Sequence, residues 1–226
     1  MAEGLTVSAI STRPTEAWAC YVLAHGAGAG MTHPFLEAVA SELGDQGIAS
    51  LRYNFPFVER RSKRPDPPAL AHATVRAAVM KAREIAPELP LVAGGKSFGG
   101  RMTSQAQASS PLPAVRGLVF LGFPLHAAKR PLAERAAHLF DAQIPMLFLQ
   151  GTRDDLADLD HLRSLCERLG ERATLVEVQD ADHSFHVPAR TGRKDGDVRA
   201  ELLNALTAWT RDVLARDGQL ISERRV

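Results

Sequence analysis

The chain has 226 residues, of which 45% are hydrophobic and 23% are charged, and its formal net charge is +1. These ordinary globular values exclude a disordered or fibrous protein, and a chain of this length can bury one sizeable core. The near-zero charge argues against a nucleic-acid or anionic-membrane binder, because such proteins carry a strong basic excess. We therefore expect one globular domain over residues 1–226.

The cysteine usage and the apolar segments favour a particular location. Cys20 and Cys166 lie far apart in apolar contexts, which is typical of reduced and buried thiols. The N-terminal segment lacks the basic and apolar regions of a secretory signal. The longest uncharged apolar stretch, at 117–125, has about half the length of a membrane span. These features predict a soluble, cytoplasmic protein without a membrane partner, as a monomer or a homodimer.

Short apolar runs alternate with longer amphipathic stretches along the chain. The runs predict strands at 5–10, 19–24, 48–54, 91–95, 115–122, 145–151 and 174–178. Helical spacing of apolar residues predicts helices at 34–43, 68–86, 98–109, 132–140, 158–169 and 198–214. Strands that are apolar on both faces and separated by helices indicate a parallel sheet covered on both sides. The predicted fold class is α/β, with a three-layer, doubly wound, mostly parallel sheet and a ligand site beyond the carboxyl ends of its strands.

The pentapeptide from Gly95 to Gly99 has the pattern G-x-S-x-G and lies between a predicted strand and a predicted helix. A sharp strand-to-helix turn requires small residues, because a Cβ at either glycine would meet the bent backbone. Such a turn lifts the Ser97 hydroxyl above the sheet. A phosphate-binding loop is excluded, since Pro90 stands where that motif requires glycine. Ser97 is therefore the candidate nucleophile.

A serine nucleophile needs a base, and the base needs a carboxylate that orients it. In this kind of turn the acid and then the histidine follow the serine along the chain. Asp154 follows the strand predicted at 145–151, and Asp155 competes with it for the role of the acid. We favour Asp154, because Asp155 lies nearer the start of the next helix.

The histidine has two candidates as well. His183 comes first after the strand predicted at 174–178, and His186 follows three residues later. We favour His183 as the base, with Asp182 beside it as a turn residue. The spacing of the two histidines resembles half of a metal site, but no further ligands complete it. The predicted catalytic residues are thus Ser97, Asp154 and His183, with no metal and no cofactor.

The glycine-rich segment HGAGAG, at 25–30, follows the strand predicted at 19–24. Its small residues allow backbone N–H groups to approach a substrate closely. We expect the N–H groups of Ala27 and Phe98 to form an oxyanion hole, which stabilises the negative charge of the transition state. His25 is expected to form hydrogen bonds within its own loop rather than to act as a base.

These motifs together resemble the α/β-hydrolase superfamily over about residues 19–214. The resemblance extends to the small predicted hydrolases related to the third subunit of the NSL chromatin complex. The segments that carry it are LAHGAGAGMTHPF, LRYNFPF, GGKSFGGRM, QGTRDD and DADHSF. The resemblance implies Ser97, Asp154 and His183 as the triad, although Asp155 stands where the group often has proline. More distant eukaryotic relatives resemble interaction proteins, so the resemblance implies the fold more than a substrate.

The segment between the strands predicted at 115–122 and 145–151 is too short for a large helical cap. A minimal hydrolase fold with a shallow, open pocket disfavours long acyl chains as substrates. The predicted function is a serine hydrolase that cleaves a small ester or thioester, with a non-catalytic interaction protein, an acyltransferase or a perhydrolase as alternatives. An anionic substrate is a further hypothesis, because basic residues are expected near the site, in the loop 59–64 and at Arg101, Arg190, Arg193 and Lys194.

Overall fold

The structure, a computed structural model, describes residues 4–126 and 133–223. Its centre is a seven-stranded sheet with the order β1-β3-β2-β4-β5-β6-β7. All neighbouring strands are parallel except β1, which pairs antiparallel with β3 at one edge. The strands are β1 (Ala9–Thr12), β2 (Ala19–Ala24), β3 (Ile48–Tyr53), β4 (Leu91–Lys96), β5 (Val115–Leu121), β6 (Met146–Gly151) and β7 (Ala173–Val178).

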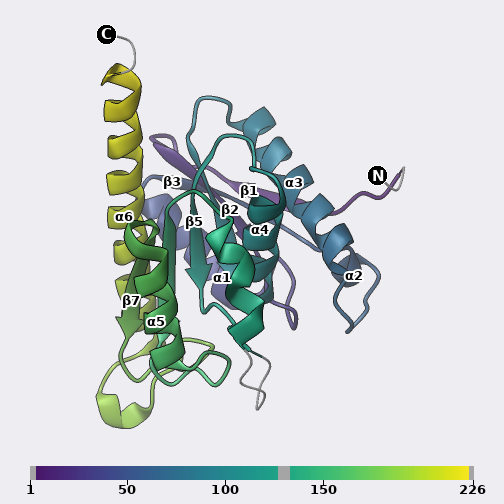
Figure 1. The fold of residues 1–226 in the computed structure, drawn as a ribbon. Helices are drawn as coiled ribbons and strands as arrows, with labels where there is room; N and C mark the ends of the chain where they lie inside the picture. Colours follow the sequence, from purple (N-terminus) through teal and green to yellow (C-terminus); the bar gives the residue numbers. More distant parts are fainter. Residues whose placement is uncertain (1–3, 127–132, 224–226) are drawn as a thin grey trace.

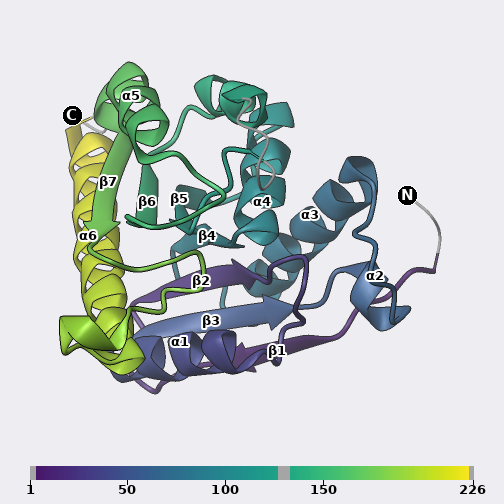
Figure 2. The same cartoon turned by 90° about the horizontal axis from the view of Figure 1, so that it is seen from below.

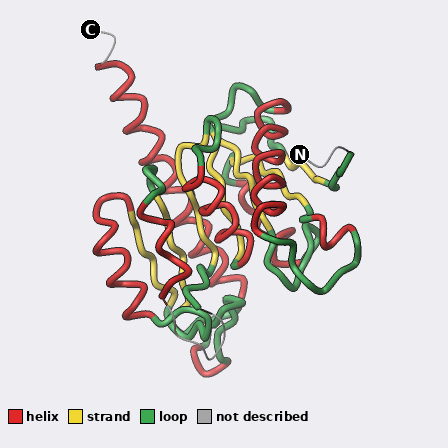
Figure 3. Tube along the Cα trace, turned by 45° about the vertical axis from the view of Figure 1, so that its right-hand side comes forward, coloured by secondary structure: helices red, strands yellow, loops and turns green. Residues whose placement is uncertain are grey.

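Helices cover both faces of the sheet and make the three layers that the sequence predicts (Figure 1). The helices α1 (Pro34–Asp45) and α6 (Asp195–Glu223) pack on one face, and the other face carries α3 (Pro68–Ile85), α4 (Phe98–Ser109) and α5 (Leu159–Leu169) (Figure 2). The tube in Figure 3 shows α6 continuing beyond the end of the sheet. Within the described ranges, no helix combines the length and the apolar character that a membrane crossing requires.

The predicted elements agree with the structure except at the ends of some segments. The largest of these differences is in α6, which extends from Asp195 to Glu223 rather than over 198–214. The edge strand lies at Ala9–Thr12 rather than at 5–10, because its backbone pairs with β3 there. The short helix α2 (Pro56–Glu59) was not predicted, since its four residues are too few to show a period. The helix predicted at 132–140 is a 3₁₀ helix, η1 (Ala133–Phe140), and residue 132 lies outside the described residues.

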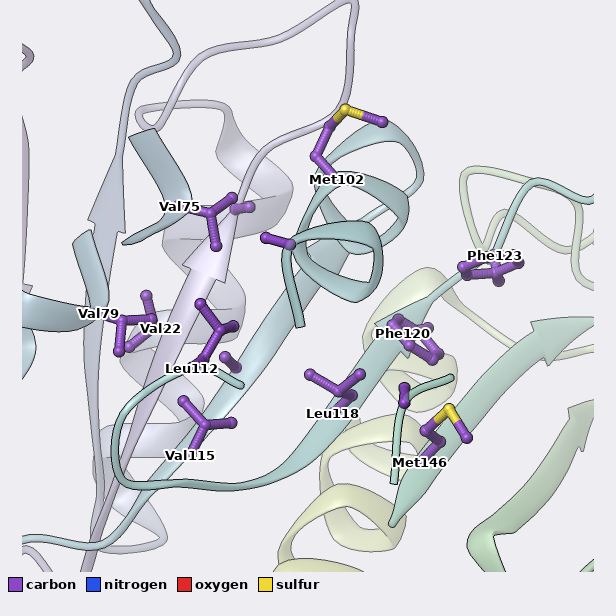
Figure 4. Packing of buried hydrophobic residues seen from close by; sticks show 14 of the residues in the cluster. Val22, Val75, Val79, Met102, Leu112, Val115, Leu118, Phe120, Phe123 and Met146 are labelled. Atoms are coloured by element: carbon purple, nitrogen blue, oxygen red, sulfur yellow. The ribbon is translucent and has the colours of Figure 1, made fainter. Parts of the chain in front are cut away.

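The core consists of two buried clusters, one on each face of the sheet. In β2, Val22 faces α3 and α4, whereas the next residue, Leu23, packs with α1 on the opposite face. This alternation follows from the two-residue period of a strand. Figure 4 shows members of the first cluster, among them Val75 from α3, Met102 from α4 and Phe120 from β5. Both cysteines are buried and free of disulfides.

The carboxyl ends of the parallel strands lie along the same edge of the sheet. The loops that follow β2, β4, β6 and β7 start at this edge, and they carry the residues of the candidate site. The connection from β5 to β6 covers only residues 122–145, which leaves little chain for a cap over this edge. The fold is therefore the compact α/β-hydrolase arrangement that the motifs indicated.

Candidate active site

Ser97 occupies a strained turn between β4 and α4. Its φ is 50° and its ψ is −113°, a conformation that a residue with a Cβ rarely adopts. A Cβ at Gly95 would lie 2.2 Å from the Ala24 carbonyl oxygen, and one at Gly99 would lie 2.6 Å from the His25 carbonyl oxygen. The sequence predicted small residues here, and the structure shows that the two glycines allow the turn to pack directly against the end of β2.

Ser97, His183 and Asp154 form a hydrogen-bonded chain. The distance from Ser97 Oγ to His183 Nε2 is 2.9 Å, and that from His183 Nδ1 to Asp154 Oδ2 is 2.7 Å. An ionised carboxylate can only accept, so the neutral imidazole carries its hydrogen on Nδ1. Nε2 is then free to accept the hydrogen of the Ser97 hydroxyl. The structure thus brings together the three residues that the sequence predicted as a triad.

The Asp154 carboxylate is fully buried and is fixed by two further hydrogen bonds. Gln150 Nε2 donates to its Oδ2, and the backbone N–H of Leu156 donates to its Oδ1 at 2.8 Å. Gln150 is itself held, because its Oε1 accepts from the N–H of Phe123 at 2.8 Å. Asp155 is exposed at the surface. The geometry therefore distinguishes Asp154 from its neighbour, and it adds Gln150, which the sequence reasoning missed.

The loop that carries His183 is shaped by Asp182. Asp182 Oδ1 accepts from the N–H groups of Ser184 at 2.8 Å and of His186 at 3.0 Å, which confirms it as a turn residue. The His186 ring is exposed and pairs with Asp195, and this pairing raises its pKa. His186 therefore lies outside the hydrogen-bonded chain. In the described part of the protein, no group of three or more metal-binding side chains is present.

Lys96 is a second site residue that the sequence reasoning missed. Its Nζ donates to the backbone carbonyl of His183 and lies 5.3 Å from the centre of the Phe185 ring. Burial lowers the pKa of Lys96 to about 8, although the carboxylates of Asp154 and Asp182 act in the opposite direction. Its place inside the G-x-S-x-G pentapeptide was the available signal. Lys96 thus links the turn of Ser97 to the loop of His183.

The predicted oxyanion donors lie on either side of Ser97. Ala27 and Phe98 belong, together with Ser97, to the wall of one cavity. Across residues 4–126 and 133–223, neither of their N–H groups has a hydrogen-bond acceptor. The N–H of Phe98 is one of the unsatisfied donors in the first turn of α4. Both N–H groups are therefore available to a substrate oxygen.

His25 holds the loop of Ala27 in place. Its Nε2 accepts from the N–H of Phe55 at 2.9 Å, so its Nδ1 carries the hydrogen that faces the Gly26 carbonyl at 2.7 Å. The ring is fully buried, and burial lowers the pKa of His25. A neutral imidazole with both nitrogens engaged has a structural role. The bond to Gly26 is the contact within the loop that the sequence predicted. The bond to Phe55, in the segment after β3, is an additional contact.

Two cavities meet at Ser97. The histidine-side cavity, of about 390 Å³, has a wall that includes Gly26, Phe35, Leu36, Lys96, Ser97 and His183. The arginine-side cavity, of about 340 Å³, has a wall that includes Asp66, Ser97, Phe98, Arg101, His126 and Arg135. A bound molecule that reaches into both cavities would place its central atoms next to the Ser97 hydroxyl.

The basic residues that the sequence singled out have different surroundings. Arg60 forms an ion pair with Asp66, Arg190 one with Asp180 and Arg193 one with Glu201. Arg101 differs from these three, because it lines the arginine-side cavity and forms no ion pair within the described ranges. Of the basic residues that the sequence singled out, Arg101 is the one that belongs to the wall of either cavity at Ser97.

The comparison with known proteins identifies the family of this chain. A family model described as an alpha/beta hydrolase domain matches residues 17–211, so the chain belongs to that family. A dienelactone hydrolase from Anabaena variabilis has a similar structure, with a TM-score of 0.73, 19% identity, and coverage of 94% of both chains.

Two further solved structures have the same fold. A serine hydrolase without a lid from Xanthomonas campestris has a TM-score of 0.69 at 24% identity, covering 90% of this chain and 89% of its own. An alpha-beta serine hydrolase homologue from Coxiella burnetii has a TM-score of 0.72 at 20% identity, covering 88% of this chain and 91% of its own. At these identities the likeness establishes the fold.

Proposed function

We propose that the protein is a serine hydrolase that cleaves a small ester or thioester through an acyl-serine intermediate. The observation that carries this proposal is the hydrogen-bonded chain from the Ser97 hydroxyl through His183 to the buried Asp154. Such a chain activates a serine, because the imidazole accepts the hydroxyl proton as the oxygen attacks. Membership in the alpha/beta hydrolase domain family supports the same class of chemistry.

In the first step, Ser97 Oγ attacks the substrate carbonyl while His183 Nε2 takes the hydroxyl proton. The carbonyl π electrons move to oxygen, where the N–H groups of Ala27 and Phe98 stabilise the negative charge. One such donor typically contributes on the order of 3 kcal/mol to transition-state stabilisation. Collapse of this intermediate breaks the bond to the leaving group, which receives the proton from His183. Asp154 keeps the imidazole in the required tautomer and stabilises its protonated form.

In the second step, His183 removes a proton from water, and the resulting nucleophile attacks the acyl-serine. The bond to Ser97 Oγ then breaks, and the serine regains its proton from His183. The free acid leaves and the original state returns. An acyltransferase or a perhydrolase would use the same residues with a different acceptor, so the identity of the products decides among these activities.

The cavities favour small substrates. Each has a volume of about 340–390 Å³, and Ser97 lies where they meet. The short connection at 122–145 leaves Ser97 without a large cap, so a long acyl chain would remain largely in water. The proposal therefore specifies short acyl groups. The narrower resemblance to relatives of an NSL subunit, the cytoplasmic location and the oligomeric state remain predictions.

The test is the turnover of short p-nitrophenyl esters and short acyl thioesters. Wild-type protein is compared with Ser97→Ala and His183→Ala, and with His186→Ala as a matched control outside the hydrogen-bonded chain. We expect wild type and His186→Ala to turn over substrate alike, and both site variants to lose at least about a thousandfold in kcat. Folded wild-type protein without turnover of either class would overturn the proposal and favour the non-catalytic interaction protein.

A further inference from the structure

Arg101 lies close to the proposed nucleophile. It belongs to α4, and its backbone N–H donates to the Ser97 carbonyl at 3.1 Å, which places it one helical turn after Ser97. Residues four apart lie on the same face of a helix, so the Arg101 side chain and Ser97 both line the arginine-side cavity. Arg135, from η1, contributes a second guanidinium to the same wall. Two cations from separate elements thus meet beside the serine.

No acidic side chain within the described ranges pairs with Arg101. Its Nε is buried and has no hydrogen-bond partner there. Burial and the nearby charge of Arg135 both lower the pKa of Arg101. A buried donor without a partner is costly, and two like charges at one site repel each other. An anion in this cavity would offset the repulsion between the two guanidinium groups that share its wall.

The other ionisable groups around the cavity do not supply that anion. Asp66 belongs to the wall, but its fully buried carboxylate is already engaged. Its Oδ2 accepts from the N–H of Phe57 at 2.9 Å, and its Oδ1 pairs with Arg60. Behind Arg101, burial and the arginine charge lower the pKa of His138 to about 4, so this imidazole is neutral at pH 7. The free charge of the cavity is therefore positive.

We propose that the arginine-side cavity binds a carboxylate on the acyl half of the substrate, through Arg101 and Arg135. This inference rests on the proposed function, and it names the substrate class as monoesters or monothioesters of short dicarboxylic acids. The planar guanidinium presents parallel N–H donors that match the two oxygens of a carboxylate. The cavity volume of about 340 Å³ accommodates a short carboxyalkyl chain between Ser97 and the arginines.

The position of His183 assigns the carboxylate to the acyl half. His183 must return its proton to the leaving group, which therefore departs on the side of the imidazole. Among the described residues, His183 belongs to the wall of the histidine-side cavity and not to that of the arginine-side cavity. The leaving group thus lies toward Phe35 and Leu36, and the acyl chain extends toward Arg101.

Three matched esters test this assignment. Monomethyl glutarate carries the carboxylate on its acyl half, methyl pentanoate is its neutral counterpart, and butanoyloxyacetate carries the carboxylate on its alcohol half. Hydrolysis is followed by proton NMR. We expect wild-type kcat/KM to be higher for monomethyl glutarate than for methyl pentanoate by about tenfold or more, as for a hydrogen-bonded charge. Butanoyloxyacetate should show no such advantage.

Variants then locate the effect. Arg101→Gln and Arg135→Gln should each lower the ratio of kcat/KM for monomethyl glutarate over methyl pentanoate about tenfold, and Arg101→Lys should retain part of it. Arg61→Gln and Arg64→Gln are the matched controls, because both residues are exposed and lie outside the cavity wall. These controls should keep the wild-type ratio. Thermal unfolding of every variant checks that the fold is retained.

A binding measurement separates this inference from the proposed function. Monomethyl glutarate is titrated calorimetrically into Ser97→Ala protein, with and without Arg101→Gln. Binding that depends on Arg101, in a protein whose wild type hydrolyses nothing, would refute the proposed hydrolase and keep the anion site. Equal losses for charged and neutral esters, an advantage only for butanoyloxyacetate, or binding that does not depend on Arg101 would each overturn the anion site.

Discussion

The serine turn, residues 94–99, and the histidine loop, residues 179–187, are joined by hydrogen bonds from Ser97 and Lys96 to His183, but the two regions are stabilised in different ways. In the serine turn, the backbone packs against backbone, and Gly95 leaves no room for a Cβ beside Ala24. In the histidine loop, side chains hold the backbone, because Asp182 accepts from two N–H groups and Lys96 donates to the His183 carbonyl. Phe185 also stacks on Phe35, with ring centres 5.8 Å apart.

The difference indicates what each region tolerates. A turn fixed by backbone packing has no alternative arrangement, so even an added Cβ in this turn should destabilise the whole fold. A loop fixed by side chains should lose its alignment first, and the fold should survive. The serine turn therefore holds the nucleophile rigidly, and the histidine loop positions the base beside it. The following predictions test this comparison, starting with the largest effect.

Asp154→Asn should leave the fold intact and lower kcat by about 10⁴-fold. The amide of asparagine can donate to Nδ1, which would move the imidazole hydrogen to Nε2 and remove the acceptor for the Ser97 proton. The measurement is steady-state hydrolysis of a short p-nitrophenyl ester. Asp155→Asn is the matched control and should stay within about twofold of wild type, as its side chain is exposed. A larger loss of kcat in Asp155→Asn than in Asp154→Asn would show that Asp155, and not Asp154, is the acid.

Gly95→Ala should reduce the free energy of unfolding by about 4 kcal/mol or more. Its Cβ would lie 2.2 Å from the Ala24 carbonyl oxygen, and its φ of 148° is unfavourable for alanine. Gly28→Ala is the control from the neighbouring loop, because a Cβ there has nothing within 4 Å. Urea unfolding measures both variants, and we expect a change of about 0.5 kcal/mol or less for Gly28→Ala. Near-native stability of Gly95→Ala would refute the rigid turn.

Lys96→Met should lower kcat about tenfold without unfolding the protein, because the His183 carbonyl loses its donor. The same variant tests the low pKa of Lys96, which is about 8 in the folded protein and 10.5 as its ordinary value. Between these values the unfolded chain binds more protons than the native protein, so native stability rises with pH. Wild type should gain up to about 2 kcal/mol over Lys96→Met between pH 7 and pH 10.

Urea unfolding at several pH values measures this difference. Lys81→Met provides the control, because Lys81 is exposed and pairs with Glu84 at the surface. Its stability relative to wild type should change little over the same range. A difference between wild type and Lys96→Met that stays flat from pH 7 to pH 10 would show that Lys96 keeps its ordinary pKa.

Ser97→Gly should be more stable than Ser97→Ala by about 1 kcal/mol. Both variants lose the hydrogen bond to His183, but only glycine relieves the φ of 50° at this position. Thermal unfolding of the two variants isolates the strain from the lost contact. Equal melting temperatures would mean that the turn stores no strain at Ser97.

Local patterns predicted most of the fold. The strand from Ala19 to Ala24 and the helix from Phe98 to Ser109 lie where the sequence placed them. The strand is a compact apolar run, and the helix was predicted despite the two glycines near its start. The edge strand was displaced, since exposed residues carry a weak period and its pairing with β3 sets the position. The four-residue helix α2 is too short for any periodic signal.

The candidate site was predicted where a residue type and a place in the fold suffice. Each of the triad residues, Ser97, Asp154 and His183, follows a strand. A serine nucleophile needs a base and the base needs a carboxylate, so the sequence was sufficient to group the three. The place of Lys96 inside the G-x-S-x-G pentapeptide was a signal, but it does not reveal that the ammonium donates to the His183 carbonyl. Gln150 gave no signal, because an amide can contact many partners and its bond to Asp154 is visible only in the structure. Arg101 was noted as one of several cations, and only the structure distinguishes it from Arg60, which pairs with Asp66 and lies outside the cavity wall.

The most direct test of the proposed chemistry is covalent labelling with a fluorophosphonate, in which Ser97 Oγ forms a bond to phosphorus and fluoride leaves. Intact mass and peptide mapping follow the adduct in wild type, Ser97→Ala, His183→Ala and the control His186→Ala. We predict one adduct on Ser97 in wild type and His186→Ala, none in Ser97→Ala, and much slower labelling of His183→Ala. Folded wild-type protein that stays unlabelled, or an adduct on another residue, would contradict the account.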